Sequence, residues 1–254
     1  MILCISALFT GCSQHKQSIN GSEKQTILIL AAASLTNVLA DMKAEYEAAH
    51  ENVELVFSFD SSGTLRKQIE EGVDADIFLS ASPLPVMQLI EGGYVSKDQV
   101  IDLLTNEIVL ISNNSIEVPI QSFEKIVTDE GVDMIATCME EVPIGQYTIQ
   151  LYKNLGLAEE LEKKANYASN VRQILDWVES GNVPYGIVYS SDAAMEEAVT
   201  VQTIADSSLY PPVQYQAAIV SASDKQDAAN DFLQYLKSDT AKQLFSDYGF
   251  ETVQ

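Results

Sequence analysis

Apolar runs alternate with amphipathic segments along most of the chain. Residues 26–32 form a continuous apolar run, which is typical of a strand buried on both faces of a parallel sheet. Apolar residues then recur at helical spacing between Leu35 and Tyr46, which predicts an amphipathic helix. The order of strand and helix repeats twice more before residue 93. This pattern predicts a β-α-β-α-β-α unit, whose parallel strands are joined by right-handed crossovers.

A second set of strands and helices follows from residue 107. Strands are predicted at residues 107–111, 134–138, 185–189 and 215–220, and helices at 145–155, 170–179, 227–237 and 240–245. At about 150 residues per domain, 254 residues suffice for one or two domains. We expect two α/β lobes joined by two crossover strands, with a ligand cleft between them. Residues 26–106 together with 214–254 would form lobe 1, and residues 107–213 would form lobe 2.

The first residues are typical of an export signal. Residues 1–10 are uncharged and mostly apolar, but too few to span a bilayer, which takes about 20 residues. The sequence LFTGC at residues 8–12 resembles a bacterial lipoprotein box, in which the cysteine receives a lipid. We therefore expect a signal peptide at residues 1–12, a lipid on Cys12, a flexible tether at 13–25 and an extracytoplasmic protein anchored to the membrane. A secreted or periplasmic soluble protein is the alternative.

Composition and charge narrow the function classes. The chain has 14 Lys and Arg against 37 Asp and Glu, a net charge of −23, which disfavours nucleic acid and anionic lipid as partners. Its two histidines and three cysteines do not have the spacing of a metal site. No nucleophile with an adjacent base can be picked out, so we expect a binding protein and not an enzyme. Cys138 would be a small buried side chain.

Four loops place small or hydroxyl residues just before a predicted helix. They surround Ser34, Ser62, Ile144 and Val171. The first turn of a helix has unpaired N–H groups and carries about half a positive charge, so several helix starts in one cleft would bind an anion without a basic side chain. Tyr189 ends a predicted strand and would add a phenolic donor at the cleft. Each residue alone could equally be an ordinary helix cap or core residue.

At these loops the chain resembles the molybdate-binding proteins of bacterial ABC importers. The matching segments are AAASLTNVLADMKAEYE (31–47), FDSSGTLRKQIEEGVDADIFLSAS (59–82), EVPIGQY (141–147), SNVRQIL (169–175) and VPYGIVYSSDA (183–193). The resemblance implies the type II periplasmic-binding-protein fold and a bound molybdate or tungstate. It also implies which residues hold this oxyanion: the hydroxyls and amides of Ser34 and Ser62, the amides of Ile144 and Val171, and the phenol of Tyr189.

The same resemblance implies the partners. An ABC permease in the membrane would receive the ligand from a monomeric receptor that has no cofactor, no catalytic residue and no metal apart from the bound oxyanion. Two departures from the family pattern leave the size of the pocket open. Gly63 replaces a third serine, and Ile144 stands where a small alanine is common.

Other ligands and activities stay possible on the same two-lobed fold. A receptor for sulfate, thiosulfate or phosphate would use similar donors, but phosphate often keeps a proton near pH 7 and would need an acceptor that the site does not obviously supply. An enzyme would need acids in the cleft, for which Asp60, Asp76 and Glu141 are the candidates. A receptor for amino acids would need a basic and an acidic side chain, for which only Arg66 with Asp60 is available.

Overall fold

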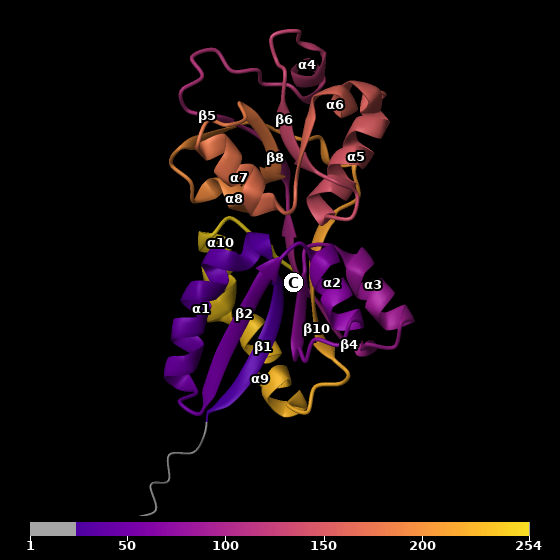
Figure 1. Cartoon of the computed structure of the whole chain (residues 1–254). Coiled ribbons are helices and arrows are strands. Elements are labelled where there is room, and N and C mark those ends of the chain that lie inside the picture. The colour runs from indigo at the N-terminus through magenta and orange to yellow at the C-terminus, as the bar shows by residue number, and fades with distance from the viewer. Residues whose placement is uncertain (1–23, 254) are drawn as a thin grey trace, which may run out of the picture.

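A computed structural model describes residues 24–253 and places them in two α/β lobes, each built around one sheet (Figure 1). The predicted signal peptide, Cys12 and most of the predicted tether lie outside the described residues. Within residues 24–253, none of the helices combines the length and the apolar character needed to cross a membrane. The predicted two-lobed α/β fold is confirmed.

The sheet of the first lobe has six strands and is covered by helices on both faces (Figure 1). In spatial order its strands are β11 (Glu251–Thr252), β4 (Val95–Asn106), β10 (Val213–Val220), β3 (Ile77–Ser80), β1 (Gln25–Ala32) and β2 (Val53–Asp60). The helices are α1 (Thr36–Ala49), α2 (Ser62–Glu70), α3 (Pro83–Glu91), α9 (Gln226–Leu236) and α10 (Asp239–Asp247). Successive residues of β1 point to opposite faces: Ile29 joins the core under α1 and α9, whereas Leu30 joins the core under α2 and α3.

The sheet of the second lobe has five strands. In spatial order they are β7 (Ala165–Ala168), β6 (Ile135–Cys138), β8 (Tyr185–Tyr189), β5 (Ile108–Asn113) and β9 (Val199–Ile204). The helices of this lobe are α4 (Phe123–Thr128), α5 (Pro143–Leu155), α6 (Ala158–Lys164), α7 (Val171–Glu179) and α8 (Ser190–Ala194). Cys138 is fully buried with a free thiol, as the sequence predicts.

The chain passes between the two sheets at two neighbouring places. β4 ends at Asn106 and β5 begins at Ile108, while the return path enters β10 at Val213. Asn106 and Val213 are paired in the antiparallel ladder of β4 and β10, so the two connections lie side by side. Two adjacent connections thus join the lobes, and loops from the two lobes can meet beside these connections.

Two features of the sheets differ from the sequence pattern. β1 pairs in parallel with β2 and β3 as predicted. β10, however, runs antiparallel to both of its neighbours, β3 and β4, so the sheet is mixed. The second sheet is mixed too, since β5 is antiparallel to both of its neighbours. The long strand β4 carries exposed polar residues such as Lys97 and Asp98 near its start, which hid it from a search for apolar runs.

Candidate functional site

The ends of strands from both lobes converge on one small cavity. Its lining residues are Ala32, Ala33, Ser34, Asp60, Ser61, Ser62, Ala81, Val142, Pro143, Ile144, Asn170, Val171 and Tyr189. The structure therefore brings together all five residues that the sequence nominates as oxyanion ligands. The free volume is only about 10 Å³, about enough for one water molecule, so this arrangement leaves no room for a sugar or an amino acid.

The wall from the first lobe includes the two serines that the sequence nominates. Ser34 lies in the short 3-10 helix η1 (Ala33–Leu35) that joins β1 to α1, and its hydroxyl lies 2.8 Å from the phenol oxygen of Tyr215. Ser62 is the first residue of α2 and is 1% exposed. Its Oγ accepts a hydrogen bond from the Ala81 amide at 3.0 Å, which leaves the hydroxyl proton free to donate into the cavity.

The capping role expected of Ser62 belongs to its neighbour. Ser61 is the N-cap of α2, and its Oγ accepts from the Thr64 amide at 3.1 Å. Because the Ser61 side chain caps the helix, the Ser62 hydroxyl is not needed for capping and is available to a ligand.

The wall from the second lobe offers backbone amides and one phenol. Ile144 is the second residue of α5, and Val171 is the first residue of α7, so both amides belong to the first turn, where no intrahelical acceptor exists. Tyr189 is the last residue of β8 and is 1% exposed. Its phenol oxygen has no hydrogen-bond partner among residues 24–253, and burial raises its pKa well above 10. Tyr189 is thus a neutral, unpaired donor at the cavity.

Basic side chains do not line this cavity among the described residues. Arg66 forms an ion pair with Glu70 at 2.6 Å, and Arg172 forms one with Glu196 at 3.2 Å. Arg66, the basic side chain that an amino-acid receptor would need for its ligand's carboxylate, is therefore not at the cavity. An anion held here would be bound by helix starts and hydroxyls, with their dipoles in place of formal positive charge.

Of the three acids considered for catalysis, only Asp60 reaches the cavity. Its Oδ1 accepts from the Ser61 amide at 2.7 Å and from the Asn170 side chain of the other lobe at 3.4 Å. Asp76 is fully buried elsewhere and accepts from the hydroxyl of Ser223 at 2.6 Å. Asp60 thus acts as an acceptor between the lobes, and Asp76 holds the first lobe together.

The lobes approach each other closely at Gly63. A Cβ atom at this position would lie 2.1 Å from the backbone oxygen of Glu141 in the opposite lobe. No methyl group fits at that distance, so glycine is required for the observed closeness of the lobes. The replacement of a family serine by Gly63 therefore has a steric reason in this chain.

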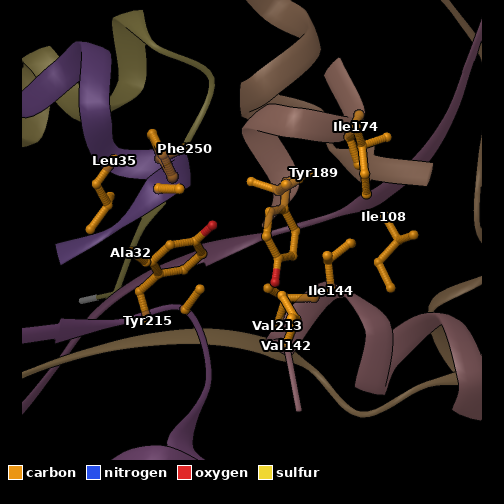
Figure 2. Packing of buried hydrophobic residues seen from close by; sticks show 14 of the residues in the cluster. Ala32, Leu35, Ile108, Val142, Ile144, Ile174, Tyr189, Val213, Tyr215 and Phe250 are labelled. Carbon is orange, nitrogen blue, oxygen red and sulfur yellow. The ribbon is translucent and has the colours of Figure 1, made fainter. Parts of the chain in front are cut away.

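Sequence reasoning missed two buried residues behind the cavity. Tyr215 holds Ser34, and its ring lies beside that of Tyr189 with centroids 5.9 Å apart (Figure 2). Asp192 is 2% exposed, and its Oδ2 accepts from the Tyr189 amide at 3.4 Å while Oδ1 has no partner among the described residues. Neither stood out because a tyrosine within a strand and an acid after one are common in ordinary cores and caps.

Burial raises the pKa of Asp192 from its ordinary 3.8 to about 7, against the opposing charge of Arg172. As the pH rises from 4 to 7, the unfolded chain loses this proton while the folded chain keeps it, so the folded state loses up to about 4 kcal/mol of stability. Asp192→Asn removes this loss. We expect the free energy of unfolding of the variant in urea, relative to that of the unaltered chain, to increase by about 3 kcal/mol between pH 4 and pH 8. A difference that does not change with pH would contradict the raised pKa.

Comparisons with known proteins identify the family of this chain. The family model described as bacterial extracellular solute-binding protein matches residues 27–251. The chain is 34% identical to a putative ABC transporter substrate-binding lipoprotein of Bacillus subtilis, over 96% of this chain and 93% of that protein. It is 35% identical to a molybdate-binding protein of Haemophilus influenzae, over 88% of this chain and 89% of that one.

Solved structures show the same fold. The substrate-binding domain of a putative molybdenum ABC transporter from Clostridium difficile superposes with a TM-score of 0.69 at 33% identity, covering 91% of this chain and all of that one (100%). The periplasmic molybdate-binding protein of Azotobacter vinelandii superposes with a TM-score of 0.80 at 19% identity, over 90% of this chain and 100% of that one. The predicted resemblance is confirmed, and the chain belongs to the family of bacterial extracellular solute-binding proteins.

Proposed function

We propose that this protein is a receptor for molybdate, and for tungstate, which it delivers unchanged to an ABC permease in the membrane. The observation that carries the proposal is the cavity itself: residues that offer hydroxyl or amide donors line it, and the buried phenol of Tyr189 has no other partner among the described residues. The relatives named molybdate-binding proteins support the choice of ligand. The receptor acts as a monomer, and the permease is its partner.

A tetrahedral dianion suits such a set of donors. Hydrogen bonds from Ser34, Ser62, Tyr189 and the amides of Ile144 and Val171 would be charge-assisted, and they are stronger in a closed cavity than in water. The net charge of −23 repels a dianion at long range, but the Debye length is only about 8 Å at physiological ionic strength. Short, oriented hydrogen bonds therefore decide the affinity.

Thermal unfolding of the full chain with molybdate, tungstate, sulfate, phosphate and nitrate tests the ligand. At 1,000 times its Kd, a ligand stabilises the folded state by about 4 kcal/mol, which raises Tm by several degrees. We expect this shift with molybdate and tungstate. A shift with sulfate or phosphate alone would show that the ligand is another oxyanion. If all five anions leave Tm unchanged, the proposal of an anion receptor is wrong.

The matched variant for this assay is Tyr189→Phe. Loss of one charge-assisted hydrogen bond is expected to weaken molybdate binding by about 10- to 100-fold in titration calorimetry. Without ligand the variant should be at least as stable as the unaltered chain, because a buried hydroxyl without a partner has been removed. Arg66→Ala is the control: its guanidinium binds Glu70, so the affinity for molybdate should stay the same. A large loss in the Arg66 variant would instead indicate direct binding by charge.

Closure of the lobes can be tested at Gly63. In Gly63→Ala the new methyl group would meet the Glu141 carbonyl, so the lobes cannot reach the described arrangement. We expect molybdate to bind at least about tenfold more weakly, and small-angle scattering to show a larger radius of gyration than for the unaltered chain at saturating molybdate. Gly131→Ala is the control, because its methyl group would meet only the end of the Asp129 side chain. Equal affinities in both variants would exclude this closure.

The anchor is the remaining part of the proposal. Cys12 would carry the lipid that holds the receptor at the outer face of the membrane, and the Bacillus subtilis relative is itself named a lipoprotein. Labelled palmitate supplied to expressing bacteria should enter the unaltered chain, which should fractionate with membranes. Cys12→Ser should abolish both. Labelling of the serine variant would place the lipid elsewhere, and an unlabelled parent chain would favour a soluble receptor.

A further inference from the structure

A chain of buried polar side chains leads from the cavity to the connection between the lobes. The Ser34 hydroxyl lies 2.8 Å from the Tyr215 phenol, and the Tyr215 phenol lies 3.5 Å from Nδ2 of Asn106. All three residues are buried. Tyr215 lies near the start of β10 and Asn106 is the last residue of β4, so both belong to the paired strands at the point where the chain crosses between lobes.

The backbone fixes the orientation of the Asn106 side-chain amide in this chain of polar groups. The Glu107 amide can only donate, and it donates to Oδ1 of Asn106 at 2.9 Å. Ser190 of the second lobe donates to the same oxygen at 2.8 Å. The other side of the Asn106 amide must then be the NH₂ group, which donates to Ser191 at 2.8 Å and faces the phenol oxygen of Tyr215.

The Tyr215 oxygen accepts from Asn106, and the Ser34 oxygen is the acceptor in reach of the phenol's own proton among the described residues. Donation from Tyr215 to Ser34 is therefore the arrangement that leaves no buried phenol proton unpaired. Burial also holds the pKa of Tyr215 well above 10, so this proton is always present. Because Ser34 Oγ accepts from Tyr215, the single hydroxyl proton of Ser34 is directed away from Tyr215 and toward the cavity. Ser62 is arranged in the same way, since the Ala81 amide occupies its oxygen at 3.0 Å.

We propose that Tyr215, oriented by Asn106, is a specificity-determining positioning residue that makes Ser34 a donor toward the ligand. This inference rests on the proposed function as an oxyanion receptor. A serine held as a donor favours oxyanions whose oxygens all accept, such as molybdate and sulfate. It disfavours hydrogen phosphate, because the proton on that ion needs an acceptor and Ser34 offers none, while the Asp60 carboxylate at the cavity already accepts from the Ser61 amide and Asn170. Sulfate and hydrogen phosphate are tetrahedral dianions of similar size, so their relative affinity isolates the effect of the proton.

The test compares Tyr215→Phe with the unaltered full chain at pH 8, where inorganic phosphate keeps one proton. Molybdate affinity is measured by calorimetry, and sulfate and phosphate by competition against molybdate. We expect molybdate and sulfate to bind about 3- to 10-fold more weakly to the variant, the loss typical of one neutral hydrogen bond, while phosphate changes little. The preference for sulfate over phosphate should therefore fall by the same factor. Equal weakening of all three anions, or no weakening, would overturn the proposal.

Two further variants separate positioning from stability. Tyr152→Phe is the matched control: it removes another buried phenol, which donates to the Phe123 carbonyl at 2.9 Å away from the cavity, and should leave all three affinities unchanged. In Asn106→Asp an oxygen replaces the NH₂ group that faces Tyr215, so the phenol proton turns away from Ser34. The preference for sulfate should fall here too, since the added charge acts equally on two dianions. An unchanged preference in Asn106→Asp would contradict the proposed direction of the chain.

A double variant completes the test. In a Ser34→Ala background, Tyr215→Phe should change molybdate affinity by less than about twofold, because its effect passes through Ser34. Full additivity would overturn the proposal. If the unaltered chain does not bind molybdate, the proposed function fails and the inference fails with it. If it binds and Tyr215→Phe binds equally well, only the inference fails.

Discussion

The site depends on how closely the two lobes meet. At Gly63 the backbone of one lobe comes so near the Glu141 carbonyl of the other that a single methyl group would hold them apart. Beside this contact, Asp60 accepts from Asn170 across the gap. The space that remains is small and buried, and in such surroundings hydrogen bonds are strong and an unpaired donor is costly. A ligand that satisfies donors from both lobes therefore stabilises the closed arrangement as well as itself.

Neutral donors, and not positive side chains, define what this cavity can hold. The two arginines near the loops are paired with Glu70 and Glu196, so they supply no free charge to the cavity. Helix starts and hydroxyls provide fixed dipoles, whose directions depend on the residues behind them. Ser61 caps α2 and frees Ser62, the Ala81 amide occupies the Ser62 oxygen, and Tyr215 occupies the Ser34 oxygen. Selectivity is thus built one layer behind the atoms that face the ligand.

One of the residues behind the ligand-facing serines also lies at the connection between the lobes. Asn106 lies where β4 ends, and it bonds Ser190 and Ser191 of the second lobe as well as facing Tyr215. Both connections between the lobes run side by side here, so the backbone must bend at this point when one lobe moves relative to the other. The orientation of a ligand-facing hydroxyl and the geometry of the hinge are consequently held by the same side chain.

The sequence by itself determined the order of strands and helices, the two-lobed α/β fold and the loops that would supply donors, because periodicity and helix starts are local properties of the chain. It did not determine β4, whose polar start resembles a loop, nor the mixed character of the sheets, because strand direction follows from pairing between distant segments. Only the tertiary structure brought Tyr215 and Asn106 to Ser34 and buried Asp192 beside Tyr189. Residues so far apart in sequence leave no local pattern, and hydrogen-bond direction and pKa depend on which groups surround a side chain in space.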